Sequence, residues 1–437
     1  MNHQAISLAR SLAAAIFAAT LLFGGAPLTA AQTETILHAF KGVSAPLGGL
    51  VADAKGALYG TTYYGGEFGQ GSVYEMVPPS TQGGAWTVTT IYSFSKTKLT
   101  DGGHPSGSLL LNLQNHKIRG TARLGGSGTS GVVYELSPPA QAGGPWTEAV
   151  LYTFTGGLDG GTPVAGVISD TKGVLYGTAA SGGQYSGGVV FRLSPPKPGG
   201  TWTEKVLHSF KGGTDGSLPL AGLIFDNLGA LYGTTWAGGR RSGGSCCGMV
   251  FQLKPPLSAN GPWTENVLHR FTGASDSAAP SAGLIFDANG ALYGTTAGYG
   301  PNDHGSVFQL IPPSNGTGPW TETILHTFTG GSDGSQSEAS LIFDSAGALY
   351  GTTHFGGPMG VGTAFKLSPP STQGGAWTEF VLHSFSWPSV STDGAYPQAP
   401  LLLLGNTFYG TTFYGGAAVN AAGTVFEITQ CASSYCR

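Results

Sequence analysis

The stretch ALYGTTWAGGRRSGG, at residues 230–244, decides how the rest of the chain is interpreted. A strand-like run that ends in glycines and two arginines is typical of a loop that binds phosphate. This stretch lacks the Lys-Ser/Thr pair of a P-loop, and no helix is predicted after it. The nucleotide-binding interpretation therefore fails, and the stretch has to be explained as part of a larger pattern.

That pattern is a repeat. The YGT motif, or a relic of it, recurs with its glycine at Gly60, Gly120, Gly177, Gly233, Gly294, Gly351 and Gly410. The successive spacings are 60, 57, 56, 61, 57 and 59 residues. Seven similar units of this length indicate a repeat architecture, in which each unit is one module that packs on its neighbours.

Each unit is predicted to form four strands. AGLIFD (221–226), ALYGTTW (230–236) and GMVFQL (248–253) are apolar, strand-like runs separated by a tight turn and a glycine-rich loop. WTEKVLHSF (202–210) alternates apolar and polar residues and represents the fourth strand. Four strands in about 58 residues, with no helix of appreciable length, are typical of a β-propeller blade.

The two ends of the repeat region predict how the ring closes. The first strand-like run, ETILHAF (34–40), has a fourth-strand sequence, whereas the last, GTVFEIT (423–429), has a third-strand sequence. The N-terminal strand can therefore complete the last blade and remove an open sheet edge. We predict an all-β, seven-bladed β-propeller over residues 32–430, with four antiparallel strands per blade. A solenoid is the alternative, but polar capping units are not evident.

Composition supports a folded, glycine-rich protein. The chain has 437 residues, of which 40% are hydrophobic and 10% charged, with 74 glycines and 27 prolines. This apolar content excludes disorder, and the glycines lack the three-residue period of collagen. The formal net charge is −4, without runs of like charge. We therefore expect no nucleic-acid or anionic-membrane partner.

Residues 1–31 are predicted to be a secretory signal peptide. Arg10 precedes the apolar run SLAAAIFAATLLFGG (11–25), and Thr29 and Ala31 are small residues at the positions before cleavage. An uncleaved membrane anchor would need about 20 apolar residues. We expect a secreted protein, extracellular or at the cell surface, with no membrane span after signal removal.

Export makes the four cysteines candidates for disulfides. Cys431 and Cys436 lie in the tail at 431–437 and can close a small loop, whereas Cys246 and Cys247 are adjacent. A bridge between neighbouring residues distorts the peptide between them. Pairing across the two sites is equally compatible with the sequence.

The units also carry a family resemblance. The pattern GALYGTT, GxVFxLxPP, GxWTExVLHSF and GGxDG resembles the GloVer tandem repeat of exported bacterial proteins, the "choice-of-anchor" family. The resemblance covers residues 34–429, and it implies an exported or surface protein of undefined biochemical role. The FDxxGxLY hairpin is also similar to NHL-type propeller blades, which implies the fold and no activity.

Most repeated polar residues have a structural interpretation. Asp53, Asp170, Asp226, Asp287 and Asp344 fall in the turn between first and second strands. A second set precedes each following blade and is interpreted as turn residues, with a weak Ca²⁺ alternative: Asp101, Asp159, Asp215, Asp276, Asp333 and Asp393. The repeated histidines 38, 208, 269, 326 and 383, replaced by Tyr92 and Tyr152 in two units, and the tryptophans of WTE are interpreted as packing residues. We therefore expect no cofactor and no metal site.

Function should lie where the copies differ. By propeller geometry, loops after the second strand and loops that lead into each blade share one face. The candidate binding residues on that face are Tyr63, Tyr64, Arg123, Trp236, Arg240, Arg241, Tyr299, His304, His354, Phe355, Phe413 and Tyr414. Aromatic rings around this face can stack on sugars, which favours a non-catalytic module that binds extracellular polysaccharide. We also expect a monomer. The alternative for these rings is packing against the neighbouring loop.

Two other functional classes stay open. A polysaccharide lyase or glycoside hydrolase would use His304 or His354 with Tyr299 and Arg241, and no catalytic residue can be assigned from the sequence. A protein-interaction scaffold would bind a surface protein through an apolar patch. In the second unit, His116, Lys117, Arg119 and Arg123 indicate either an anion-binding sector or a decayed repeat.

Overall fold

A computed structural model describes residues 33–429, except 82, 96–100, 142, 240–246, 259–260, 274–275, 299–303, 317, 373, 388–391 and 417–421. All described residues belong to one compact unit, residues 32–430. The predicted signal peptide, the cysteine tail and Cys246 thus lie outside the described residues. Their roles stay predictions, and everything below concerns residues 33–429.

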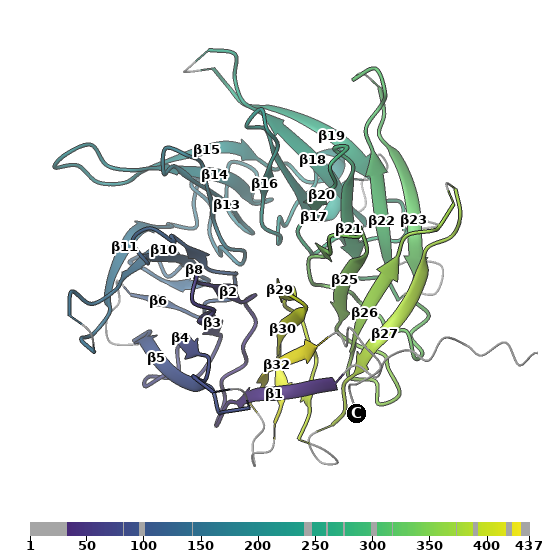
Figure 1. Cartoon of the computed structure of the whole chain (residues 1–437). Coiled ribbons are helices and arrows are strands. Elements are labelled where there is room, and N and C mark those ends of the chain that lie inside the picture. Colours follow the sequence, from purple (N-terminus) through teal and green to yellow (C-terminus); the bar gives the residue numbers. More distant parts are fainter. Residues whose placement is uncertain are drawn as a thin grey trace, which may run out of the picture. The chain divides into compact units, whose positions relative to one another are not determined.

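Seven four-stranded antiparallel sheets follow one another as blades (Figure 1). Blade 1 contains β2 (Val51–Ala52), β3 (Leu58–Thr62), β4 (Ser72–Val77) and β5 (Thr87–Ser93). Blade 2 contains β7 (Leu110–Leu111), β8 (Ile118–Ala122), β10 (Val132–Ser137) and β11 (Thr147–Thr153). Blade 3 contains β12 (Ile168–Ser169), β13 (Leu175–Ala179), β14 (Val189–Ser194) and β15 (Thr203–Ser209). Blade 4 contains β16 (Ile224–Phe225), β17 (Leu231–Gly239), β18 (Cys247–Lys254) and β19 (Thr264–Arg270).

The remaining blades repeat this order. Blade 5 contains β20 (Ile285–Phe286), β21 (Leu292–Thr296), β22 (Ser306–Ile311) and β23 (Thr321–Thr327). Blade 6 contains β24 (Ile342–Phe343), β25 (Leu349–Thr353), β26 (Thr363–Ser368) and β27 (Thr378–Ser384). Blade 7 contains β29 (Leu402–Leu404), β30 (Thr407–Thr412) and β32 (Thr424–Thr429), and β1 (Thr33–Ala39) is its outer strand.

The antiparallel pairing of β1 with β32 joins the two ends of the repeat region, with Thr33 opposite Thr429 and Ala39 opposite Thr424. The two-stranded pairs β6 (Gly102–Gly103) with β9 (Leu124–Gly125), and β28 (Gly394–Ala395) with β31 (Tyr414–Gly415), add short ladders in the loops. Within the described ranges, one 3-10 turn, η1, spans Gly213–Asp215. The predicted all-β, seven-bladed propeller is confirmed. The first strands are mostly shorter than predicted, since only residues 224–225 of the 221–226 run form ladder pairs.

The apolar core lies between blades. Seven clusters of buried side chains each draw residues from two consecutive blades. One of them joins Leu58 and Tyr74 of blade 1 to Val425 of blade 7. Each blade thus contributes side chains to two apolar clusters, one with each neighbouring blade. This explains why a single repeat cannot bury its apolar faces alone. The tryptophans of the WTE position pack against six of the seven clusters, in agreement with their interpretation as packing residues.

Two local features recur: a turn aspartate in blades 1, 3, 4, 5 and 6, and a β-bulge in all seven blades. In the turn before the second strand, an aspartate Oδ1 accepts backbone N–H bonds, as at Asp226 from Leu228 and Ala230, both 2.8 Å. This confirms the turn interpretation of that aspartate set. The outer strand carries a β-bulge, such as the register shift at which Phe251 faces Val267 while Val250 faces His269. A bulge changes the direction of the side chain that follows it. The sequence did not predict this bulge.

Close backbone approach is required where the chain enters the first strand of a blade. A Cβ at Gly107 would lie 2.3 Å from the backbone nitrogen of Gly166 in the next blade. Only glycine fits such a contact. Among the described residues, the structure contains no helix with the length and hydropathy to cross a bilayer.

Candidate functional site

One face of the ring is built from a backbone frame that repeats at every blade. In the connecting loop before each blade, one non-glycine residue adopts a left-handed φ between 52° and 60°. These seven residues are Ala45, His104, Thr162, Leu218, Ala279, Gln336 and Tyr396. Non-glycine residues in this conformation are uncommon and often lie at functional sites. The frame is therefore the same in every copy, while the side chain that it presents differs.

A second set of varying residues is tied to this frame. The residue that follows the second strand in six blades, and Trp236 within β17 in blade 4, donates its backbone N–H to the carbonyl of the left-handed residue, at 2.9–3.3 Å. These donors are Tyr63, Arg123, Ala180, Trp236, Ala297, His354 and Phe413. The expectation that both kinds of loop share one face is thus met by direct hydrogen bonds. Fourteen variable side chains surround a constant scaffold.

Aromatic residues are concentrated on blades 6 and 7 of this face. The His354 ring stacks on Phe355 at 4.1 Å between centroids, and Tyr396 contacts both rings at 5.2 and 5.4 Å. Tyr396 also contacts Tyr414, whose ring meets Phe413 at 4.4 Å. Tyr414 is 46% exposed, so part of this cluster faces solvent.

The cluster continues onto blade 1 across a cleft of about 200 Å³, which Tyr64, Phe413 and Tyr414 line together. Tyr64 meets Tyr63 at 4.7 Å, and both tyrosines contact the His104 ring at 5.2 and 4.8 Å. We call the whole set the aromatic arc. Its members are His104, Tyr63, Tyr64, Phe413, Tyr414, Tyr396, His354 and Phe355.

The arc contains half of the candidate binding residues. Six of the twelve predicted residues belong to it: Tyr63, Tyr64, His354, Phe355, Phe413 and Tyr414. Arg123, Trp236 and His304 lie on other parts of the frame, and His304 packs against Gly330. Arg240, Arg241 and Tyr299 lie outside the described residues.

Sequence reasoning missed His104, Tyr396 and their polar neighbours. Their signal was the position itself, because each precedes a proline at the same place in the connecting loop, in HP at 104–105 and YP at 396–397. Trp387, 42% exposed, adds a further ring 5.5 Å from Tyr396. The site therefore draws on two loops per blade: the loop after the second strand and the loop that leads into the blade.

His354 is the most polar point of the arc. Its Nδ1 lies 3.3 Å from Glu338 Oε2 and 2.7 Å from Gln398 Nε2. The imidazole is thus held by groups from two connecting loops and by the stacked Phe355. This arrangement can accept and donate hydrogen bonds to hydroxyl groups, and a histidine beside a carboxylate can also transfer protons.

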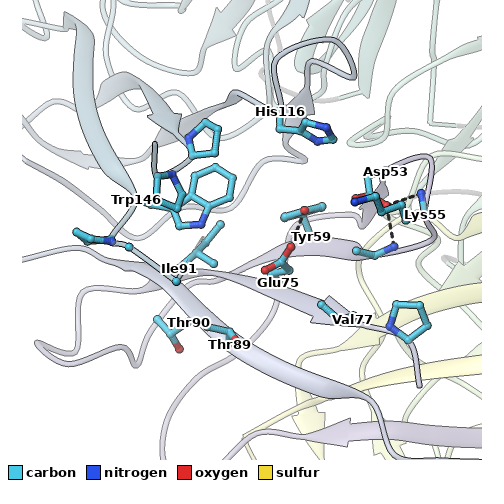
Figure 2. Close-up of a pocket in the computed structure, with 17 residues that line it drawn as sticks. Asp53, Lys55, Tyr59, Glu75, Val77, Thr89, Thr90, Ile91, His116 and Trp146 are labelled. Atoms are coloured by element: carbon cyan, nitrogen blue, oxygen red, sulfur yellow. Dashed lines mark hydrogen bonds between the residues drawn. The ribbon is translucent and has the colours of Figure 1, made fainter. Parts of the chain in front are cut away.

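A second cleft lies at the opposite end of blades 1 and 2 (Figure 2), about 1160 Å³ and open. Its lining includes Tyr59, Glu75, His116 and Trp146. Tyr59 donates a hydrogen bond to Glu75 Oε1 at 2.7 Å, and burial with this carboxylate raises the Tyr59 pKa. Sequence reasoning did not predict this cleft, because hairpins of two separate repeats form it.

The anion-binding interpretation of the second unit is not supported. Glu135 accepts hydrogen bonds from Lys117 Nζ at 2.6 Å and from Arg119 Nε at 2.8 Å. Burial would raise the pKa of Glu135, but the two cationic donors outweigh it and hold the pKa below its ordinary value. Two of the four positive candidates are therefore neutralised within the blade.

Polar clusters connect the outer strands of consecutive blades. Each combines a histidine or tyrosine from one blade, the connecting-loop aspartate and the WTE glutamate of the next, such as Tyr152, Asp159 and Glu204. Tyr152 donates to Asp159 at 3.0 Å, while Glu204 Oε1 is buried and has no hydrogen-bond partner among the described residues. Burial, aided by the Asp159 charge, raises the pKa of Glu204 to about 7.

The packing interpretation of the repeated His/Tyr position is therefore incomplete. The rings do pack, as His208 does against Phe210 at 4.7 Å, but their polar tips reach the connecting-loop carboxylate. His208 Nε2 lies 3.3 Å from Asp215 Oδ2, and the same aspartate oxygen accepts the Lys211 N–H at 2.7 Å. The second aspartate set thus closes its loop, as predicted, and also joins two blades.

Comparison with known proteins agrees with this architecture. The model of the Gloeobacter/Verrucomicrobia repeat matches residues 26–247 and 240–436. No curated protein matches the chain. Of the solved structures, 201 chains match. A candidate 6-phosphogluconolactonase from Bacteroides uniformis is 16% identical, with a TM-score of 0.50 over 81% of this chain and 88% of its own.

Two further matches are more distant. A Thermus thermophilus protein described as an oxidoreductase (glucose dehydrogenase) is 13% identical, with a TM-score of 0.40 over 91% of this chain and 99% of its own. A Trypanosoma rangeli sialidase in complex with sialic acid is 9% identical, with a TM-score of 0.40 over 92% of this chain and 59% of its own. At these identities the likeness concerns the fold alone.

Proposed function

The chain belongs to the Gloeobacter/Verrucomicrobia repeat family, and we propose that its propeller is a non-catalytic module that binds an extracellular polysaccharide along the aromatic arc. The observation that carries the proposal is the continuity of the arc. Ring contacts run through blades 6 and 7, and the Tyr64–Phe413–Tyr414 cleft joins them to blade 1. A row of rings across successive blades matches an extended chain of sugars better than a compact ligand.

The small cleft favours binding of a long ligand along the surface over enclosure of a whole small ligand. Its cleft of about 200 Å³ is smaller than the roughly 300–1,000 Å³ of pockets that enclose a drug-sized ligand. One sugar can enter it while neighbouring sugars lie on the exposed faces of Tyr64 and Tyr414, which are 37% and 46% exposed. Glu338, Gln398 and His354 supply hydrogen-bonding groups beside these rings.

The test is a panel of polysaccharides applied to the purified protein and to two variants. Tyr414→Ala removes an arc ring, and Tyr185→Ala removes a ring of equal 46% exposure that lies off the arc in blade 3. We expect Y414A to weaken binding at least tenfold and Y185A to leave it unchanged. Equal affinity in both variants, or binding to no glycan, would contradict the proposal.

A second candidate is a polysaccharide lyase or hydrolase. The observation in its favour is the 3.3 Å contact between His354 Nδ1 and Glu338 Oε2 on the same arc. The panel distinguishes the two functions when reducing ends and unsaturated products are read from the same wells. Products that disappear in His354→Gln would favour the enzyme, and binding without products favours the module.

A further inference from the structure

Some polar clusters between blades contain a histidine and others a tyrosine, and this difference bears on metal binding. In three of them, imidazole and carboxylate atoms converge within 4.8 Å of one another. These groups are His208–Asp215–Glu265, His269–Asp276–Glu322 and Glu34–His383–Asp393. At the Tyr92 and Tyr152 positions, a phenol replaces the imidazole and donates to the aspartate at 2.9 and 3.0 Å.

The His269 cluster is informative because two of its three facing atoms, on His269 and Glu322, have no hydrogen-bond partner among the described residues. His269 Nε2 lies 3.6 Å from Asp276 Oδ2 and 3.5 Å from Glu322 Oε1. Among the described residues, neither His269 Nε2 nor Glu322 Oε1 has a hydrogen-bond partner, although both atoms are buried. Buried polar atoms without partners cost free energy, so such a convergence points to a missing ligand.

The surroundings hold these atoms in place. The bulge in β19 separates Val267 from His269 and sets the direction of the imidazole, whose ring contacts Phe271 at 4.8 Å. Asp276 accepts hydrogen bonds from Thr272 N at 2.9 Å and Thr272 Oγ1 at 2.6 Å. The aspartate is oriented by a neighbour, as carboxylates that bind metals commonly are.

The spacing and chemistry match a small transition-metal dication. Zn²⁺ binds imidazole nitrogen and carboxylate oxygen at about 2.0–2.2 Å in tetrahedral geometry, which separates neighbouring ligand atoms by roughly 3.3–3.5 Å. The two separations from His269 Nε2, 3.5 and 3.6 Å, are close to this value, and all three ligand atoms lie within 4.8 Å of one another. Ca²⁺ would need about six to eight oxygen ligands, and this cluster offers two carboxylates and a nitrogen.

We propose that His269, Asp276 and Glu322 bind a Zn²⁺-type dication that joins the outer strands of blades 4 and 5. His208–Asp215–Glu265 and Glu34–His383–Asp393 are further copies of the site, between blades 3 and 4 and blades 6 and 7. Each copy supplies three protein ligands, so water or another small ligand completes the tetrahedron. The metal links blades 4 and 5, which also meet through apolar contacts and through the hydrogen bond that Thr234 Oγ1 donates to the Ala282 carbonyl at 3.2 Å.

The chain contains its own controls, because tyrosine occupies the histidine position in two blades. His269→Tyr copies a residue that the fold already accommodates, so the ring should fold normally. Tyr152→His creates the missing imidazole beside Asp159 and Glu204. The two variants change the number of triads in opposite directions while leaving the carboxylates in place.

The experiment is a titration of the chelator-stripped full chain with Zn²⁺ by calorimetry and with Co²⁺ by visible absorption. We expect H269Y to lower the number of metal equivalents by one, Y152H to raise it by one, and Co²⁺ to show intense tetrahedral bands. Melting temperature should rise with added Zn²⁺ in the wild type. Circular dichroism checks that both variants fold.

Three results would overturn the proposal. The first is the absence of Zn²⁺ and Co²⁺ binding by the folded wild-type chain. The second is a stoichiometry that H269Y leaves unchanged. The third is a thiolate charge-transfer band with Co²⁺, because it would place the metal on cysteines instead.

Discussion

Replacement of Glu204 by glutamine should stabilise the protein at alkaline pH and leave its stability unchanged at acidic pH. Glu204 joins blade 3 to the Tyr152–Asp159 pair of blade 2, and one of its oxygens is buried with no hydrogen-bond partner in the part of the chain that the structure describes. Burial, with the Asp159 charge, raises its pKa from 4.5 to about 7. The glutamine amide is neutral and can donate to Asp159.

The sign follows from proton linkage. Below pH 4.5 the carboxyl group is protonated in the folded and unfolded chain, so it imposes no cost. Between 4.5 and about 7 the folded chain keeps a proton that the unfolded chain has lost, so stability falls as pH rises. Above this window the cost of the buried charge is complete.

The magnitude can be bounded. The rise in the Glu204 pKa from 4.5 to about 7 corresponds to at most ~3.4 kcal/mol in the free energy of unfolding. Part of the side chain remains in contact with water, and screening reduces the effect to about 1–2 kcal/mol. For a chain of about 400 folded residues, this raises the melting temperature by roughly 1–2.5 °C.

The assay is thermal unfolding, followed by circular dichroism, at about pH 4 and about pH 8.5. Glu67→Gln is the matched control, because Glu67 is exposed and its replacement should change nothing. A shift of equal size at both pH values, or a lower melting temperature of E204Q at pH 8.5, would refute the reasoning.

Three further perturbations test the packing and the ion pairs. Phe271→Ala empties a site that is 1% exposed between two blades, and urea unfolding should show a loss of about 3–5 kcal/mol. Gly107→Ala forces a Cβ against backbone and should lower the melting temperature, whereas Gly222→Ala, which meets nothing within 4 Å, should have little effect. Glu135→Gln weakens two cationic hydrogen bonds at a cost of about 1–3 kcal/mol near neutral pH. Since the Glu135 pKa is lowered, this difference should shrink as pH falls below 4.5, and a difference independent of pH in urea titrations would contradict it.

The sequence predicts the blades well because the information is local. Turn aspartates, YGT strands and the alternation in WTExVLHSF all act within one repeat, and a period repeated seven times averages out errors at single positions. The role of the N-terminal strand is also predictable, because its sequence matches the type of strand that the last unit lacks. The β-bulge in the outer strands is not predictable, because a register shift of one residue leaves no clear mark on an apolar-polar pattern.

The candidate site was harder to predict because its members come from different repeats. Tyr396 of one connecting loop meets His354 of the preceding blade, and no pattern within either unit indicates the contact. The inter-blade clusters had a usable signal. At the junction that lacks the glutamate, where Val88 replaces it, the connecting loop at 41–48 also lacks the aspartate. Their joint loss indicates that the two residues belong to one structural unit.

The pairing of β1 with β32 has a mechanical consequence. Because the strands are antiparallel, Thr33 and Thr429 leave the ladder at the same end, where they face each other. A tension applied between the two ends would load these hydrogen bonds one after another, as in a zipper, rather than all at once in shear. The ring would then open at this seam under low force, and each released blade would lose one of its two neighbours in turn.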